Sequence, residues 1–365
     1  MLFKRMNKRN LISTIVLIVV LLGVSILSSQ SITLPRIINL IFIYSIAALA
    51  LNVICGCLGE FVLGHGGFVL IGYTVAVLIM KQIQGSVDPT FFSEKIYTVL
   101  GGTLHPLGYG LIIVDVIIAA IATGLIGFVV GVIALGRLKG DYLAIVTLGI
   151  SLIFVNICKN FDSLGGGVGI SVSTSISGSP VLYAAFLIIV VILILAFMKS
   201  RFGRAIRACR DDNIAAEACG VPVNKTKILA FTFASFIAGI AGGLLAFYSS
   251  FAPTFFGQDR SILFLIIIVL GGLGSLTGSI LAACLIVFYE QWFCMQSWVP
   301  DFFANNPKII YGIILVLIML FRSSGILGTS EFTWKWFYSI IGKIKGLFKK
   351  KDEPHAKANS PKGVE

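Results

Sequence analysis

The stretch LISTIVLIVVLLGVSILSS, Leu11 to Ser29, contains no charged residue and is long enough to cross a bilayer as a helix. A hydrocarbon core of roughly 30 Å requires about 20 apolar residues in one helix. The basic segment KRMNKRN precedes it, but the apolar run is too long for a signal peptide and no small-residue cleavage site follows. We therefore interpret it as a retained first transmembrane helix.

The rest of the 365-residue chain has the same character. Hydrophobic residues make up 57% and charged residues 12%, and the mean hydropathy is +1.00. The apolar runs are continuous rather than alternating, which excludes a β-barrel porin. Breaks at Pro, Gly and charged residues predict an all-α polytopic integral membrane protein of about ten transmembrane helices, over residues 11–29, 35–56, 61–80, 107–135, 142–158, 180–198, 226–249, 261–273, 276–294 and 308–321.

The distribution of basic residues predicts that both ends of the chain are cytoplasmic. With a cytoplasmic N-terminus, 22 of the 28 Lys and Arg residues fall on the inside, as the positive-inside rule requires. The net charge of +12 is then explained by topology and anionic lipid, and no exposed basic face indicates nucleic-acid binding. The six exceptions on the outside are Arg36, Lys81, Lys95, Lys159, Arg260 and Lys308.

Cysteine and histidine give no sign of redox or metal chemistry. The seven cysteines form no C-x-x-C pair and their number is odd, and the three histidines are scattered. No convergent His, Asp or Ser set indicates a membrane enzyme, so we expect no catalytic residue and no metal site. The residues concerned are Cys55, Cys57, Cys158, Cys209, Cys219, Cys284, Cys294, His65, His105 and His355.

A polar island, FGRAIRACRDDNIAAEACGVP, runs from Phe202 to Pro222 on the expected cytoplasmic side. Asp211 or Asp212 can cap a short helix, and Gly220 followed by Pro222 can end it. Two turns of helix are not stable alone, so a partner surface is expected to hold them. The alternative is a solvated loop whose arginines only fix topology.

Residues 203–221 of this island, GRAIRACRDDNIAAEACGV, resemble the coupling segment in permease subunits of ABC importers for branched-chain amino acids. The motifs RLKGDYLAIVTLG, GGGVGI, ILAFTFASFIAGIAGGLLAF and VLGGLGSLTGSILAA are similar to the LivM-type permeases of that family in the same order, over about residues 35–328. The chain departs from the family at Ser151, where glutamate is common, and at Gly167 and Val168. These departures leave the exact substrate open.

The resemblance implies an ABC importer permease fold over residues 1–330, with the coupling segment at 203–222. The implied partners are a second homologous permease subunit, two ABC ATPase subunits that bind ATP and Mg, and an extracytoplasmic binding protein, in a bacterial inner membrane. No cofactor is expected in this chain, which has no G-x-x-x-x-G-K-[ST] loop. The residues expected to couple to the ATPase are Gly203, Arg204, Arg207, Asp211, Asp212, Ala215, Ala216, Glu217 and Gly220.

Two glycine-rich stretches, GEFVLGHGGFVLIG and GGLGSLTGS, interrupt apolar segments and are candidates for the translocation path. Glycine also allows helices to pack closely, and a lone histidine is often a packed, hydrogen-bonded residue. Two intramembrane acids, Asp115 and Glu290, are not expected to act in transport, because each lies near an expected outer end and can reach the interface. The expected path residues are Gly64, His65, Gly66, Gly67, Gly271, Gly272 and Gly274.

The C-terminal residues 331–365 are interpreted as a basic amphipathic cytoplasmic tail. Apolar residues recur there at three- and four-residue steps among lysines, which predicts a helix on anionic lipid. A topology anchor with a disordered end is the alternative. Two other functions stay open: an ion-coupled secondary transporter, which needs paired carboxylates near the bilayer midplane, and an ABC permease of the same family for urea, amides or sugars.

Overall fold

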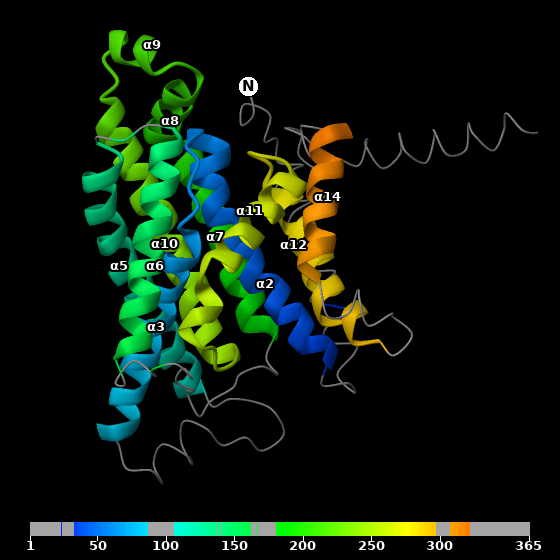
Figure 1. Cartoon of the computed structure of the whole chain (residues 1–365). Coiled ribbons are helices and arrows are strands. Elements are labelled where there is room, and N and C mark those ends of the chain that lie inside the picture. The colour runs from blue at the N-terminus through cyan, green and yellow to red at the C-terminus, as the bar shows by residue number, and fades with distance from the viewer. Residues whose placement is uncertain are drawn as a thin grey trace, which may run out of the picture.

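The structure, a computed structural model, describes residues 33–86, 106–136, 140–161, 180–296 and 307–321, with single residues at 23, 138 and 166. Six long helices form the bundle in Figure 1: α2 (Thr33–Asn52, continued by the π-helical η1, Val53–Leu58), α3 (His65–Ser86), α5 (Pro106–Ala134), α6 (Asp141–Asn160), α7 (Pro180–Lys199) and α10 (Val223–Tyr248). The shorter elements are α8 (Arg201–Asp211), α9 (Asn213–Ala218), η4 (Pro253–Phe256), α11 (Gln258–Gly271), α12 (Leu276–Gln291), η5 (Phe293–Met295) and α14 (Pro307–Phe321).

Every regular element among the described residues is a helix, which confirms the all-α prediction there. Six helices are long and apolar enough to cross a membrane, so the protein is polytopic, but this part of the chain does not reach the expected count of about ten. The first expected span, 11–29, lies outside the described residues. The expected spans 261–273, 276–294 and 308–321 correspond to α11, α12 and α14 with 14, 16 and 15 residues. At 1.5 Å per residue these measure about 21–24 Å, less than a full bilayer core.

The centre of the bundle is the helix formed by α2 and η1. All of its residues from Ile37 to Leu58 are buried, because α7, α10, α11 and α12 pack around it. On the periphery, α5 and α6 expose large aliphatic side chains such as Leu125, Ile133 and Ile153. An apolar surface of this extent suits lipid rather than water.

Close helix contacts in the bundle depend on glycine. A Cβ atom at Gly72 of α3 would lie 2.6 Å from the carbonyl oxygen of Gly239 in α10, and one at Gly242 would lie 2.1 Å from the carbonyl oxygen of Val69. The main chains of α3 and α10 therefore touch directly. This is the packing that small residues permit between membrane helices.

The chain re-enters the bundle between η1 and α3. It turns at Gly59, where φ is +83°, and α3 begins at His65, whose Nε2 lies 2.9 Å from the carbonyl oxygen of Ala47. Ala47 lies 11 residues before Leu58, about 16 Å along the helix. The N-terminus of α3 thus lies deep in the bundle rather than at its end.

A second re-entrant segment joins α10 to α11. The Tyr73 hydroxyl accepts from the Phe251 amide at 2.9 Å, and the Gly66 amide donates to Ser261 Oγ at 2.9 Å. Gly66 lies in the first turn of α3 and Ser261 lies in the first turn of α11. The N-termini of α3 and α11 therefore meet inside the bundle.

Candidate functional site

The elements α8 and α9 project from one end of the helical bundle, with α9 at the tip (Figure 1). The side chain of Ser200 caps α8 by accepting from the Gly203 amide, and α8 packs against α7, α10 and η1. The polar island of the sequence is therefore a structured projection. A solvated loop whose arginines only fixed the topology would not need this cap and these helix contacts.

Capping explains how so short a helix as α9 forms. Asp212 Oδ1 accepts from the amides of Ile214 and Ala215 at 2.8 and 3.2 Å. After Ala218 the chain turns at Gly220, where φ is +79°, a conformation that favours glycine. The predicted short helix with its Asp cap and glycine stop is confirmed, and the cap is Asp212, whereas Asp211 is the exposed last residue of α8.

The base of the projection is fixed to the end of α7. A Cβ atom at the buried Gly203 would lie 2.4 Å from the Met198 carbonyl oxygen, so this position requires glycine. Arg207 donates to the carbonyl oxygens of Gly203 and Met198, and Arg204 donates to that of Lys199. In this chain these two arginines therefore tie α8 to the helix before it.

The outer surface of α9 does not include every residue expected to couple to the ATPase. Ala216 is only 4% exposed and packs inward, so it does not belong to a contact surface. Ala215 and Glu217 are exposed, and Ile214 is 81% exposed. A substitution such as Ala216→Trp would therefore disturb the packing of the chain itself, whereas Ile214 is the most exposed large apolar side chain of α9.

The projection contacts the re-entrant segment before α3. Lys227, near the start of α10, forms a part-buried ion pair with Glu60. The side chain of Arg210 in α8 lies over Gly59, where an added Cβ would be 3.1 Å from Arg210 Cγ. Movement of α8 would therefore displace the segment that leads to His65.

The expected path residues around His65 are buried contact points. A Cβ atom at Gly64 would lie 1.9 Å from the Thr147 carbonyl oxygen, one at Gly66 would lie 2.6 Å from that of Phe256, and one at Gly67 would lie 2.6 Å from Ser151 Oγ. The imidazole of His65 is buried against Ala47 and Phe264. The packed, hydrogen-bonded interpretation of His65 is confirmed.

The second glycine stretch forms the tight turn between α11 and α12. Gly272 and Gly274 have φ of +108° and +89°, and the main chain of Gly271 contacts that of Gly278. Asn52 fixes the turn: its Oδ1 accepts from the Gly274 amide at 2.8 Å, and its Nδ2 donates to Ser275 and Ser279. This turn and the His65 stretch lie at opposite ends of α11, so the two candidate path segments do not come together.

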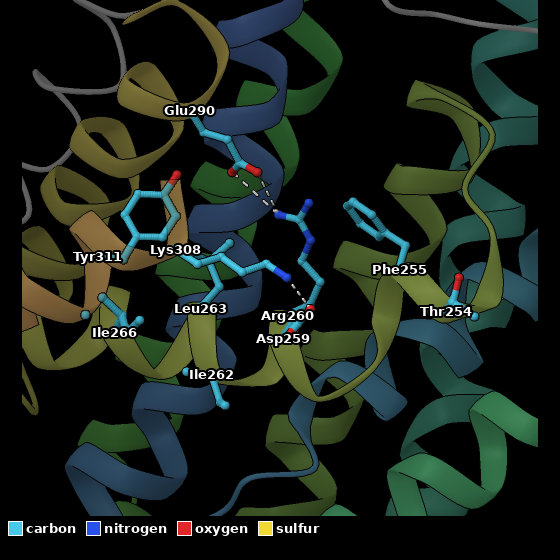
Figure 2. A pocket seen from close by; sticks show the side chains of 11 residues that line it. Thr254, Phe255, Asp259, Arg260, Ile262, Leu263, Ile266, Glu290, Lys308 and Tyr311 are labelled. Atoms are coloured by element: carbon cyan, nitrogen blue, oxygen red, sulfur yellow. Dashed lines mark hydrogen bonds and ion pairs between the residues drawn. The ribbon is translucent and has the colours of Figure 1, made fainter. Parts of the chain in front are cut away.

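A cavity of about 420 Å³ lies between η4, α11, α12 and α14 (Figure 2). The guanidinium of Arg260 donates to Glu290 at 3.3 Å and to the Tyr44 hydroxyl at 3.0 Å, and it lies 3.9 Å from the centroid of the Phe255 ring. A second ion pair joins Lys308 to Asp259. None of the expected path glycines lines this cavity.

Comparison with known proteins identifies the family of the chain. The family described as branched-chain amino acid transport system / permease component matches residues 33–319. The chain belongs to this family.

Curated relatives agree with this assignment. The permease is 32% identical to the high-affinity branched-chain amino acid transport system permease protein LivM of Salmonella typhimurium, over 78% of this chain and 68% of the relative. It is 31% identical to LivM of Escherichia coli K12, over 79% and 68%. The autoinducer 2 import system permease protein LsrD of Salmonella paratyphi B is 25% identical over 70% and 81%, so related members import other solutes. No solved structure matches the chain.

The charged residues of the cavity were not expected as a site in this permease. Arg260 and Lys308 were assigned to the outside only by counting charges, and Glu290 was set aside because it lies near an expected outer end, whereas the fold pairs Glu290 with Arg260. The signal in the sequence that could have predicted this site is the presence of two opposite charges, Arg260 and Glu290, 30 residues apart in an otherwise apolar region. The second discounted acid, Asp115, is buried, and its carboxylate has no hydrogen-bond partner in the described ranges.

Proposed function

We propose that this chain is the transmembrane permease subunit of an ATP-driven importer of branched-chain amino acids. It forms half of the translocation path, paired with a second homologous permease subunit. Two ABC ATPase subunits bind ATP and Mg, and an extracytoplasmic binding protein delivers the substrate. The LivM relatives support the substrate class, and the absence of a phosphate-binding loop from the sequence is consistent with ATP hydrolysis in a partner chain.

The observation that carries the proposal is the exposed, capped helix α9. A six-residue helix is unstable alone, and this one holds an isoleucine that is 81% exposed at the tip of a projection. We infer that Ile214 and its exposed neighbours Ala215, Glu217 and Ala218 enter a groove on the ATPase subunit. ATP binding moves this helix, and the ion pair of Lys227 with Glu60 passes the movement to the re-entrant segment before α3.

The proposed topology has ten spans and both ends in the cytoplasm of a bacterial inner membrane. In this topology one pass across the membrane is formed by η4 together with α11. Another pass is formed by α12 together with η5, although these helices are short. The positive-inside distribution of Lys and Arg supports this orientation. The basic tail, residues 331–365, lies outside the described residues; we propose that it lies on anionic lipid at the inner surface.

Reconstitution in proteoliposomes tests the proposal. The chain together with its second permease, its ATPase subunits and loaded binding protein should accumulate leucine only when ATP is supplied. Omission of the ATPase should abolish uptake, and a proton gradient alone should not replace ATP. Robust uptake of leucine by the purified chain under a proton gradient would contradict the proposal and support a secondary transporter.

A further inference from the structure

The cavity beside Arg260 reaches the depth of the apolar core. Arg260 donates to the hydroxyl of Tyr44, and Tyr44 lies 10 residues after Leu34 and 14 before Leu58 in the buried central span. These separations are about 15 and 21 Å along the helix. Charged groups at such a depth are costly against lipid and are normally found at a protein contact or a water-filled path.

The charges around the cavity are balanced and paired. Arg260 pairs with Glu290, and both side chains are about one fifth exposed. Lys308 pairs with Asp259, and both are largely exposed. Figure 2 shows the two pairs on neighbouring sides of one space. Two cations and two anions leave the formal charge at zero, so a neutral molecule with one ammonium and one carboxylate group can enter without leaving a charge uncompensated.

Apart from the two ion pairs, the lining of the cavity is mainly apolar, and the hydroxyl groups of Thr254 and Tyr311 are its other polar side-chain groups. Ile262, Leu263 and Ile266 of α11 line it, and so does Tyr311 of α14. The buried hydroxyl of Tyr311 has no hydrogen-bond partner among the described residues. An aliphatic surface with a few convergent polar groups, in a volume of about 420 Å³, is typical of small-ligand sites.

We propose that this cavity is a transit site for an aliphatic amino acid, which it binds as a zwitterion. The substrate carboxylate binds Arg260, its ammonium group binds Glu290, and its side chain contacts Leu263 and Ile266. On binding, Arg260 exchanges the Glu290 carboxylate for the substrate carboxylate, and Glu290 exchanges the Arg260 guanidinium for the substrate ammonium group. The net charge of the site is therefore zero both with and without substrate. The proposal rests on the proposed function, since it locates the path of that importer.

A pair of size variants tests the apolar part of the site in the complete transporter in proteoliposomes. The measured quantity is the ratio of leucine to valine uptake at saturating loaded binding protein. Ile266→Phe narrows the cavity and should lower the ratio on the order of tenfold, the scale of one methylene group in a fitted pocket. Leu263→Ala widens the cavity and should raise the ratio. Leu285→Phe, at a position 57% exposed on α12, is the matched control and should leave the ratio unchanged.

The charged part is tested with Glu290→Gln, which keeps an oxygen acceptor for Arg260 but loses the negative charge. Leucine uptake should fall about tenfold, the cost of one hydrogen bond to a charged group, while assembly and ATP hydrolysis remain. An unchanged ratio of leucine to valine uptake in both size variants would overturn the proposal. A Glu290→Gln variant that no longer co-purifies with the second permease would also overturn it, because this face would then be a subunit interface. These outcomes require a parent complex that transports; no ATP-driven uptake by the parent would instead contradict the proposed function.

Discussion

Lys227 in α10 and Glu60 in the segment before α3 form an ion pair, and their side chains are only 7% and 13% exposed. The two residues are 167 positions apart in the sequence. The pair joins the helix that follows the projecting α9 to the segment that re-enters the bundle. It therefore connects the helix next to the projection directly with the interior of the bundle.

We expect Glu60→Gln to destabilise the protein strongly, because it leaves the buried Lys227 ammonium without its counter-charge. Removal of one partner of a buried pair typically costs about 3–5 kcal/mol. The double variant Glu60→Gln with Lys227→Met should be closer to the parent than Glu60→Gln alone. Thermal unfolding of the purified permease in detergent measures this, and additive losses in the double variant would contradict a direct pair.

Asn52 should be essential for the turn between α11 and α12. Replacement by Leu preserves the size but leaves the buried Gly274 amide without its acceptor, a cost of about 1–3 kcal/mol for this group alone. Ser45→Ala is the control, because Ser45 donates only to the Ile41 carbonyl of its own helix. The thermal midpoint of Asn52→Leu should fall well below that of Ser45→Ala, and equal midpoints would show that the hydrogen bonds of Asn52 do not hold the turn.

Gly64 should tolerate no side chain, since an added Cβ would lie 1.9 Å from the Thr147 carbonyl oxygen. Gly64→Ala is expected to lower stability, and transport only in proportion to the folded protein that remains. Gly149→Ala is the matched control, because nothing lies within 4 Å of its Cβ position and alanine favours a helix. A fully stable Gly64→Ala variant with lost transport would instead indicate that Gly64 takes part directly in the translocation path.

The sequence was sufficient to predict those features that depend on local patterns. Continuous apolar runs predicted the long helices, and Asp212 with Gly220 predicted α9, because caps and stops act over a few residues. The cavity was not predicted, since Arg260 and Glu290 meet only when α11 and α12 pack against Tyr44. The inward direction of Ala216 was missed for the same reason: in a helix of six residues, no periodicity distinguishes the inner face from the outer one.

The cap of α9 provides a test of coupling that leaves the transmembrane helices intact. Asp212→Ala should weaken α9 by about 0.5–2 kcal/mol and reduce the stimulation of ATP hydrolysis by loaded binding protein. Asp212→Asn retains an acceptor oxygen and should preserve the stimulation. The global thermal midpoint should change little in either variant. Normal stimulation in Asp212→Ala would show that an ordered α9 is not needed for coupling.

The central claim, that α9 docks on an ATPase subunit, can be measured at a native thiol. Cys219, next to α9, is free and exposed, whereas the other described cysteines are buried or half-buried. A membrane-impermeant maleimide should label Cys219 in inside-out vesicles and not in intact cells, with Cys219→Ser giving the background. Assembly with the ATPase should slow this labelling several-fold, and Ile214→Asp, but not Ile214→Val, should restore the fast rate. A labelling rate that is the same with and without the ATPase would contradict the account.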